Sequence, residues 1–207
     1  SVEGYEHIVE ELGLESVYAG RHKGSETDFV GTATSIKNSD CELLFLGSFI
    51  KDTILLYTAV RDAGWQGTVV TNMVPYLPEI PGAADGGMNG MYAVAPFYVP
   101  DFSNVEPDSW VGRWQASYEE RFGVEPAAQA VIGYLSADLT VIALERAGPE
   151  LTVEKLVEGL ESISTYQDPF GNLELSLGPA KHVATNYLNL YQVQDQRWVT
   201  VAEKVQF

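Results

Sequence analysis

Apolar residues in the first part of the chain recur mostly at helical spacing. Over residues 2–12 they fall three and four positions apart, and Gly13 suits the end of that helix. A second helix is predicted from Ser25–Asp28, whose Ser-x-x-acid spacing is typical of a helix start. A third, longer helical pattern ends at Ala63, just before a glycine. The periodicity therefore predicts three helices in this region.

Short apolar or β-branched segments separate these helices. Leu43–Leu46 is a continuous apolar run, as expected for a strand that is buried on both faces. Ser16–Ala19 and Gly67–Thr71 are interpreted as strands as well, and Gly90–Phe97 predicts a further one. Strands that alternate with helices over short loops are typical of a parallel sheet. The pattern thus predicts an α/β fold class.

The second half of the chain changes character after the Pro- and Asp-containing stretch Pro100–Pro107, which we interpret as a domain-crossing segment. Aromatic residues then recur every four positions, which predicts a helix with an aromatic core face: Trp110, Trp114, Tyr118 and Phe122. A long helix is predicted over Ala127–Ala147, and Thr152 suits the N-cap of another. Alternating apolar and polar residues on both sides of Asp195-Gln196 predict a C-terminal β-hairpin.

Composition limits the classes of partner. The 207 residues carry 12 basic and 29 acidic side chains, a formal net charge of −17 that repels nucleic acid and anionic membrane surfaces. No apolar run approaches the roughly 18–20 residues of a membrane span, so direct membrane insertion is not expected. Any signal peptide is expected to have been removed or to lie outside this sequence. The single cysteine, Cys41, excludes an internal disulfide, and we interpret it as a residue at the edge of the core.

Motifs of common enzymes are missing from the sequence. It has no Gly-x-Ser-x-Gly, phosphate-loop, dinucleotide-binding or His-Glu-x-x-His motif. None of the histidines, His7, His22 and His182, has a second His or Cys at metal-ligand spacing. Pairs of acidic residues follow from the composition, and adjacency alone does not give carboxylates the different environments that acid–base catalysis needs. We therefore predict a protein that is not an enzyme and that has no metal and no cofactor. An α/β enzyme is the alternative only if a titratable pair converges in a cleft.

Two loops are candidates for a small-molecule site. Ligands of parallel α/β sheets bind beyond the carboxyl ends of the strands, and here these ends are Gly47–Phe49 and Asn72-Met73. Phe49 offers an apolar wall, Asn72 offers a hydrogen-bond donor and an acceptor, and backbone N–H groups at a helix start can receive anionic or carbonyl oxygens. The alternative interpretation is that both loops are ordinary turns between a strand and a helix.

The order and spacing of several short motifs resemble a known family. The motifs are Gly24–Phe29, Leu43–Ser48, Ala59–Gly64, Arg121–Pro126, Ala143–Gly148 and Tyr187–Trp198. Together they resemble the type I periplasmic solute-binding proteins, of which the branched-chain amino-acid receptors of ABC importers are the best known. The resemblance covers nearly the whole chain.

The resemblance implies a parallel-sheet, Rossmann-like lobe of a two-lobed periplasmic-binding fold, with additional helices belonging to the other lobe and a C-terminal β-hairpin. Residues 1–101 would form the second lobe, residues 102–184 a helical segment of the first lobe, and residues 185–207 the hairpin that returns to the second lobe. Family members begin with an N-terminal lobe that this sequence would lack. The helices of residues 102–184 would therefore pack on a sheet outside this sequence, pack on a neighbouring chain, or rearrange.

In function, the resemblance implies an exported protein, periplasmic or extracellular, that serves the membrane permease of an ABC importer. Its solute would be a small polar molecule such as an amino acid, an amide or an aromatic acid, bound in the cleft between two lobes. The residues that match the family's site, or lie near it, are Phe49, Asn72, Met73, Tyr76 and Tyr134. A ligand-sensing module of a receptor or regulator with the same fold is the alternative.

The loop after Gly67–Thr71 departs from the pattern of this family. Its amino-acid receptors often place an acidic residue there for the ammonium group of the solute, whereas this sequence has Asn72-Met-Val-Pro-Tyr76. The nearest acid along the chain is Glu79. The departure predicts that an amide, a urea-like compound or an aromatic acid is as good a candidate solute as an α-amino acid.

Overall fold

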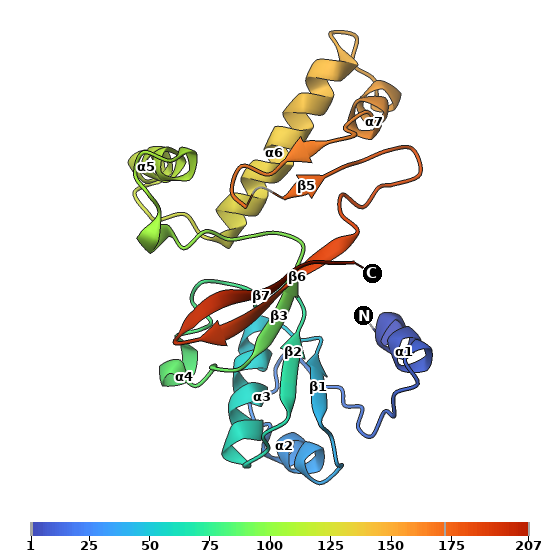
Figure 1. Cartoon of the computed structure of the whole chain (residues 1–207), viewed down its shortest axis with the longest axis vertical. Coiled ribbons are helices and arrows are strands. Elements are labelled where there is room, and N and C mark those ends of the chain that lie inside the picture. Colours follow the sequence, from blue (N-terminus) through green and yellow to red (C-terminus); the bar gives the residue numbers. More distant parts are fainter. Residues whose placement is uncertain (1, 172, 207) are drawn as a thin grey trace. The chain divides into compact units, whose positions relative to one another are not determined.

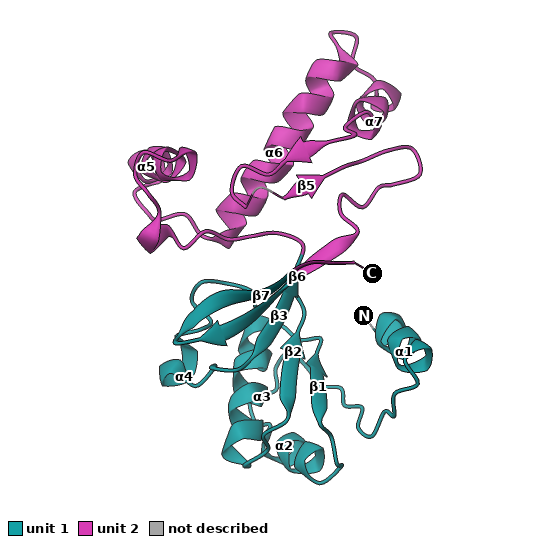
Figure 2. Ribbon diagram, viewed as in Figure 1, with its two compact units in different colours: residues 1–95, 190–202 teal, residues 96–189, 203–207 magenta. Residues whose placement is uncertain are grey.

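The computed structural model describes residues 2–171 and 173–206. Helices and strands follow one another along the chain (Figure 1) and divide into two compact units (Figure 2). Unit 1 comprises residues 1–95 and 190–202, and unit 2 comprises residues 96–189 and 203–207. The chain therefore passes between the units near residues 95, 189 and 202. The assignment of these segments to two lobes of a larger protein stays a prediction.

A five-stranded sheet lies largely in unit 1. Its order is β1-β2-β3-β6-β7. The strands are β1 Leu43–Leu46, β2 Thr68–Thr71, β3 Tyr92–Ala95, β6 Tyr187–Gln194 and β7 Arg197–Gln206. Strands β1, β2 and β3 run parallel, with Leu46 opposite Thr71 in register. This arrangement confirms the predicted α/β fold class and the predicted parallel order of the first strands.

Four helices belong to unit 1: α1 Val2–Glu11, α2 Val30–Lys37, α3 Ile50–Asp62 and α4 Ala83–Gly86. Helices α2 and α3 pack against each other and bury Ile36, Tyr57 and Val60. The Tyr57 hydroxyl donates a hydrogen bond of 2.7 Å to the Asn89 carbonyl oxygen, which satisfies its polar group inside the core. By contrast, α1 buries none of its residues.

Two local predictions for unit 1 are wrong. Helix α2 does not start at Ser25 but at Val30, whose N–H donates to Asp28 Oδ1 at 3.0 Å. Ser16–Ala19 is not a strand, and residues 14–23 have no regular structure. A strand needs a neighbour for its N–H and C=O groups, and the described sheet begins with β1, so Ser16–Ala19 has no strand to pair with.

Strand β1 is buried on one face only, which corrects the expectation of burial on both faces. Leu44 and Leu46 are buried, whereas Leu43 is 56% exposed and Phe45 is 40% exposed. Successive side chains of a strand point to opposite faces, so the two exposed side chains share one face. Burial of the face that carries Leu44 and Leu46 therefore accounts for only half of this apolar run.

Unit 2 is built mainly from helices. It contains η1 Phe102–Asn104, α5 Trp110–Phe122, α6 Ala128–Ala147, α7 Val153–Glu161 and the antiparallel pair β4 Tyr166–Gln167 and β5 Glu174–Leu175. Helices α6 and α7 approach closely at Gly159, where a Cβ atom would come within 2.4 Å of the Ala143 carbonyl oxygen. Thr152 caps α7 as predicted, because its Oγ1 accepts the N–H of Lys155 at 3.2 Å.

Four aromatic rings from α5, α6 and the loop after β4 pack together in unit 2. We call them the aromatic cluster: Trp110, Trp114, Tyr134 and Phe170. Their contacting pairs have ring centroids between 4.8 and 5.9 Å apart and meet edge to face. The prediction of an aromatic core face on α5 holds only in part, because Trp114 and Tyr118 are half-buried whereas Trp110 and Phe122 are exposed.

Helix α6 bears on the prediction that the chain has no segment long and apolar enough to span a membrane. Among the described residues it is the one helix long and apolar enough to cross a membrane, by length and composition alone, with a mean hydropathy of 1.2. The earlier expectation rested on uninterrupted apolar runs, and α6 escapes that criterion because Asp138, Glu145 and Arg146 interrupt it. Core helices pass the same test, so this feature is weak evidence for a membrane span.

The C-terminal hairpin forms where it was predicted. Strands β6 and β7 are joined by Asp195 and Gln196, which both have positive φ angles of 48° and 60°. Two successive residues of this kind fit a type I′ turn, whose twist matches that of the flanking strands. The hairpin is anchored by Trp198, whose Nε1 donates to the Leu77 carbonyl oxygen at 2.8 Å.

Candidate functional site

Two large apolar side chains lie beyond the carboxyl ends of neighbouring strands in unit 1. Leu46 and Thr71 are the last residues of β1 and β2 and stand opposite each other in register. Phe49 follows three residues after the first, and Met73 two residues after the second. Phe49 is 73% exposed and Met73 is 49% exposed. Exposed apolar side chains at this edge of a parallel sheet are the expected lining of a small-molecule site.

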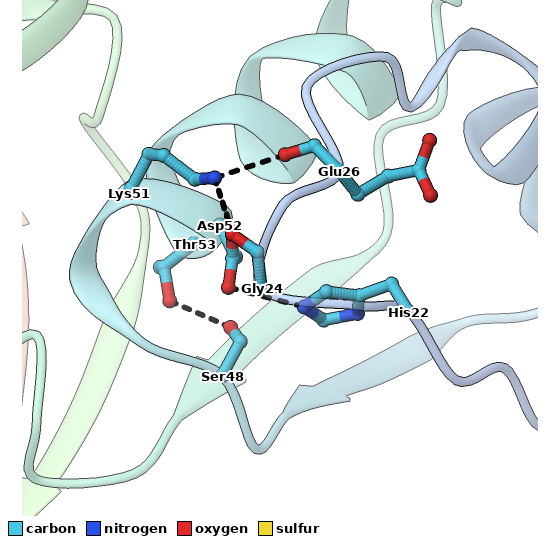
Figure 3. A network of polar contacts seen from close by, with 7 residues as sticks. All are labelled: His22, Gly24, Glu26, Ser48, Lys51, Asp52 and Thr53. Carbon is cyan, nitrogen blue, oxygen red and sulfur yellow. Dashed lines mark hydrogen bonds and ion pairs between the residues drawn. The ribbon is translucent and has the colours of Figure 1, made fainter.

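Phe49 also stands at the start of α3. It is the N-cap residue of this helix, with extended backbone angles of φ −81° and ψ 170°, and its side chain cannot cap the first turn. The preceding hydroxyl is engaged elsewhere, because Ser48 Oγ lies 2.7 Å from Thr53 Oγ1 in a buried hydrogen bond (Figure 3). The first turn of α3 therefore has no side-chain cap from its N-cap residue. The N-cap position carries an exposed phenyl ring instead.

Asn72 stabilises the loop after β2. Its Oδ1 accepts the N–H of Val74 at 2.9 Å, which closes a turn two residues long. Just before it, Thr71 Oγ1 donates to the Leu46 carbonyl oxygen at 3.1 Å and ties β2 to β1. The Thr71 bond holds the ends of β1 and β2 together. Met73 lies within the turn that Asn72 closes.

The remaining predicted site residues lie elsewhere. Tyr76 is almost fully buried in unit 1, where its ring stacks on Tyr191 at 4.1 Å and meets Trp198 at 5.4 Å. Tyr134 lies on α6 in unit 2 and belongs to the aromatic cluster, where burial and the nearby charge of Asp138 raise its pKa. The structure therefore brings Phe49, Asn72 and Met73 to one edge of the sheet, and it places the rings of Tyr76 and Tyr134 in packed aromatic surroundings.

A polar network beside Phe49 was missed by the sequence analysis (Figure 3). The Asp52 carboxylate, on the first turn of α3, is only 3% exposed. Its Oδ2 lies 3.3 Å from His22 Nε2, and its Oδ1 lies 3.4 Å from Lys51 Nζ. Lys51 and Asp52 could have been noticed as charges at a helix start, but no local pattern links them to His22, thirty positions earlier.

Clustered metal ligands or a reactive thiol would indicate a metal centre or an enzyme. Within residues 2–171 and 173–206, no group of three or more His, Cys, Asp or Glu side chains could hold a metal ion. Cys41 is half-buried, and its Sγ lies 3.3 Å from the Leu43 carbonyl oxygen. Burial raises the pKa of this thiol, which disfavours the nucleophilic thiolate.

Comparisons with known proteins agree with the geometry of unit 1. The sequence matches the family described as periplasmic binding protein over residues 1–197. It is similar in structure to a branched-chain amino-acid ABC transporter protein from Thermus thermophilus with bound valine, at 17% identity and a TM-score of 0.84, covering 100% of this chain and 56% of that one. No curated protein matches the sequence.

Two further structures have the same fold. One is a fatty acid ABC transporter substrate-binding protein from Thermomonospora curvata, with 18% identity, a TM-score of 0.81 and coverage of 100% of this chain and 54% of that chain. The other is a solute-binding protein of an ABC transporter from R. palustris in complex with benzoate, with 16% identity, a TM-score of 0.75 and coverage of 99% and 54%. This chain thus spans just over half the length of the structures that it matches.

Proposed function

Because the chain belongs to the periplasmic binding protein family, we propose that it is part of the solute-binding component of an ABC-type importer. Family members are solute-binding proteins rather than enzymes, and structures with the same fold are substrate-binding proteins of ABC transporters. In this role the protein is exported, binds a small solute outside the cytoplasm and delivers it to a membrane permease. The pair of exposed side chains Phe49 and Met73, at the carboxyl ends of neighbouring strands, carries the proposal.

The side chains at this edge favour a solute with an apolar body. The phenyl ring of Phe49 and the thioether of Met73 offer apolar contact area and no charge. In residues 47–53 and 72–76 the one acidic residue is Asp52, which is buried and lies beside His22 and Lys51. An ammonium group of a solute would therefore find no exposed carboxylate in these two loops. This favours an aromatic acid or an amide over an α-amino acid.

Structures with the same fold hold an aromatic acid in one case and an α-amino acid in another. The R. palustris protein is a complex with benzoate, and the T. thermophilus protein has bound valine. Burying one aromatic side chain against a solute contributes about 1.5–3 kcal/mol. A contact of this size makes the contribution of Phe49 to binding measurable by mutation.

Titration calorimetry of the chain with benzoate, benzamide and L-valine tests the proposal. We expect benzoate or benzamide to bind more tightly than L-valine, and Phe49→Ala to weaken that binding about tenfold to hundredfold. Phe122→Ala is the matched control, because Phe122 is also a largely exposed phenyl ring but lies on α5 in unit 2. Equal affinity of Phe49→Ala and the unmodified chain for every solute would overturn the site assignment.

A further inference from the structure

We infer that Asp52 and His22 are positioning residues, which hold the first turn of α3 and with it Phe49. The inference rests on the proposed function, since Phe49 is the apolar contact of the proposed site. The residues that do the holding belong to the loop of residues 20–28, which we call the strap. The strap has no helix or strand of its own, and it meets the first turn of α3 in a network of polar contacts (Figure 3).

Lys51 makes the first connection between α3 and the strap. Its Nζ donates to the Gly24 carbonyl oxygen at 2.7 Å and to the Glu26 carbonyl oxygen at 3.0 Å. Both acceptors are backbone atoms, so the contact depends on the path of the strap rather than on its side chains. One ammonium group from α3 thus joins two points of the strap.

Asp52 makes the second connection, and it does so from a buried position. Its Oδ2 lies 3.3 Å from His22 Nε2 and its Oδ1 lies 3.4 Å from Lys51 Nζ, while Oδ1 receives no hydrogen bond from the described residues. A carboxylate taken out of water is strongly unfavourable unless it is paired. His22 and Lys51 are the partners that the structure places beside this carboxylate, so Asp52 contacts both the strap and its own helix.

The His22 ring contacts two segments of unit 1. Its Nε2 lies 3.3 Å from Asp52 Oδ2 on α3. Its ring also meets the ring of Phe29, the N-cap residue of α2, edge to face at 5.2 Å. These two contacts hold the ring of His22 against the first turn of α3.

The geometry links this contact to the proposed site. Phe49 is the N-cap residue of α3 and Asp52 is three residues further along the same first turn. The buried hydrogen bond between Ser48 and Thr53 spans the same turn from the other side. A shift of Asp52 therefore moves the backbone that carries the phenyl ring of Phe49.

The other histidine–acid pairs of the described chain provide matched controls. His182 Nε2 lies 3.0 Å from Glu161 Oε1, and His7 Nε2 lies 3.6 Å from Glu11 Oε2. In neither pair is the acid buried as Asp52 is. His182→Gln thus removes a histidine–acid contact of shorter distance that has no part in the first turn of α3.

Amide hydrogen exchange followed by mass spectrometry tests the positioning without any solute. We expect His22→Gln and Asp52→Asn to raise the exchange rate of residues 48–53 about tenfold or more, while His182→Gln leaves it unchanged. His22 is partly exposed, so its replacement leaves the core of unit 1 intact. Unchanged exchange in both the His22 and Asp52 variants would overturn the inference.

Calorimetric titration with benzoate tests the effect on the site. We expect His22→Gln to bind benzoate about tenfold more weakly than the unmodified chain does, and His182→Gln to bind it as tightly as the unmodified chain. Faster exchange of residues 48–53 with unaltered benzoate affinity would overturn the positioning role. Absence of any solute binding by the unmodified chain would overturn the proposed function. The hydrogen-exchange data need no solute, so they would still test whether His22 and Asp52 hold the first turn of α3.

Discussion

Helix α3 of unit 1 begins differently from two helices of unit 2, α5 and α7. In unit 2, α5 and α7 begin after Ser109 and Thr152, whose hydroxyl oxygens accept the N–H of Gly112 at 2.9 Å and that of Lys155 at 3.2 Å. In unit 1, α3 begins after Phe49, which has no capping oxygen. A side-chain cap stabilises a helix by about 1 kcal/mol. Helix α3 lacks this stabilisation, as α6 of unit 2 does after Ala127, and it is α3 that presents an exposed ring at the proposed site and contacts the strap.

The buried carboxylates of the two units also differ in the groups that they contact. Asp52 in unit 1 is buried beside His22 and Lys51. Asp168 in unit 2 is buried as deeply, and its Oδ1 accepts the N–H of Phe170 at 2.7 Å, but its Oδ2 has no hydrogen-bond partner among the described residues. Burial raises the pKa of Asp168. One carboxylate thus connects two segments of the chain, and the other stabilises a turn in its own vicinity.

The largest loss of stability confined to one unit is expected from a substitution in the aromatic cluster. Phe170 is buried and contacts the rings of Trp110, Trp114 and Tyr134. Phe170→Ala should lower the free energy of unfolding by about 3–5 kcal/mol, because it leaves a cavity among these rings. Denaturant unfolding measures the loss, and hydrogen exchange should show it in α5 and α6 but not in β1 and β2. Equal loss of protection in both units would contradict the division.

Asp168 is predicted to make unit 2 less stable as the pH rises. A carboxyl group whose pKa is raised by folding contributes stability below its ordinary pKa and loses it as the pH rises through the raised value. Asp168→Asn keeps the acceptor for the Phe170 N–H and carries no charge. It should therefore remove roughly 1 kcal/mol of the decrease in the free energy of unfolding with rising pH. Thermal unfolding from pH 3 to 8 gives the comparison, with the exposed Asp62 as the control for an Asp→Asn change. Parallel curves for Asp168→Asn and the unmodified chain would refute the prediction.

The smallest stability effect concerns the helix starts themselves. Phe49→Ser places a capping hydroxyl in backbone angles that suit an N-cap, so it should raise the free energy of unfolding by about 0.5–1 kcal/mol while weakening solute binding. Ser109→Ala should lower that free energy by about 1 kcal/mol and leave binding unchanged. Chemical denaturation and calorimetry of both variants check the pair. A gain in binding by Phe49→Ser would show that the phenyl ring is not part of the site.

Several predictions failed because a local pattern did not determine which groups its residues would contact. The Ser25–Asp28 spacing matched a helix start, but Asp28 rather than Ser25 accepts the first N–H of α2. Ser16–Ala19 has the residues of a strand and no strand beside it in the described sheet. Leu43–Leu46 forms the predicted strand, yet Leu43 and Phe45 are exposed because only the face that carries Leu44 and Leu46 is covered. Residue type decided what these segments could form, and their neighbours decided what they did form.

The site shows the same limit. Phe49, Asn72 and Met73 could be chosen from the sequence because the ends of parallel strands fall at one edge, whichever residues form the rest of the fold. Tyr76 and Tyr134 could not be judged in this way, since an aromatic ring near a loop or on a helix can either face a solute or pack in a core. Their packing against Tyr191 and against the aromatic cluster is visible only in three dimensions.

Local sequence was enough to decide the α/β class, the strands β1, β2 and β3, the cap of α7 at Thr152 and the turn at Asp195-Gln196. Each of these depends on periodicity or on turn chemistry within a few residues. Only the tertiary structure decided that His22 lies 3.3 Å from Asp52, because this contact joins residues far apart in sequence through the packing of α2 and α3. Burial, which makes that carboxylate matter, is a property of the surrounding fold and not of the residues beside it in the chain.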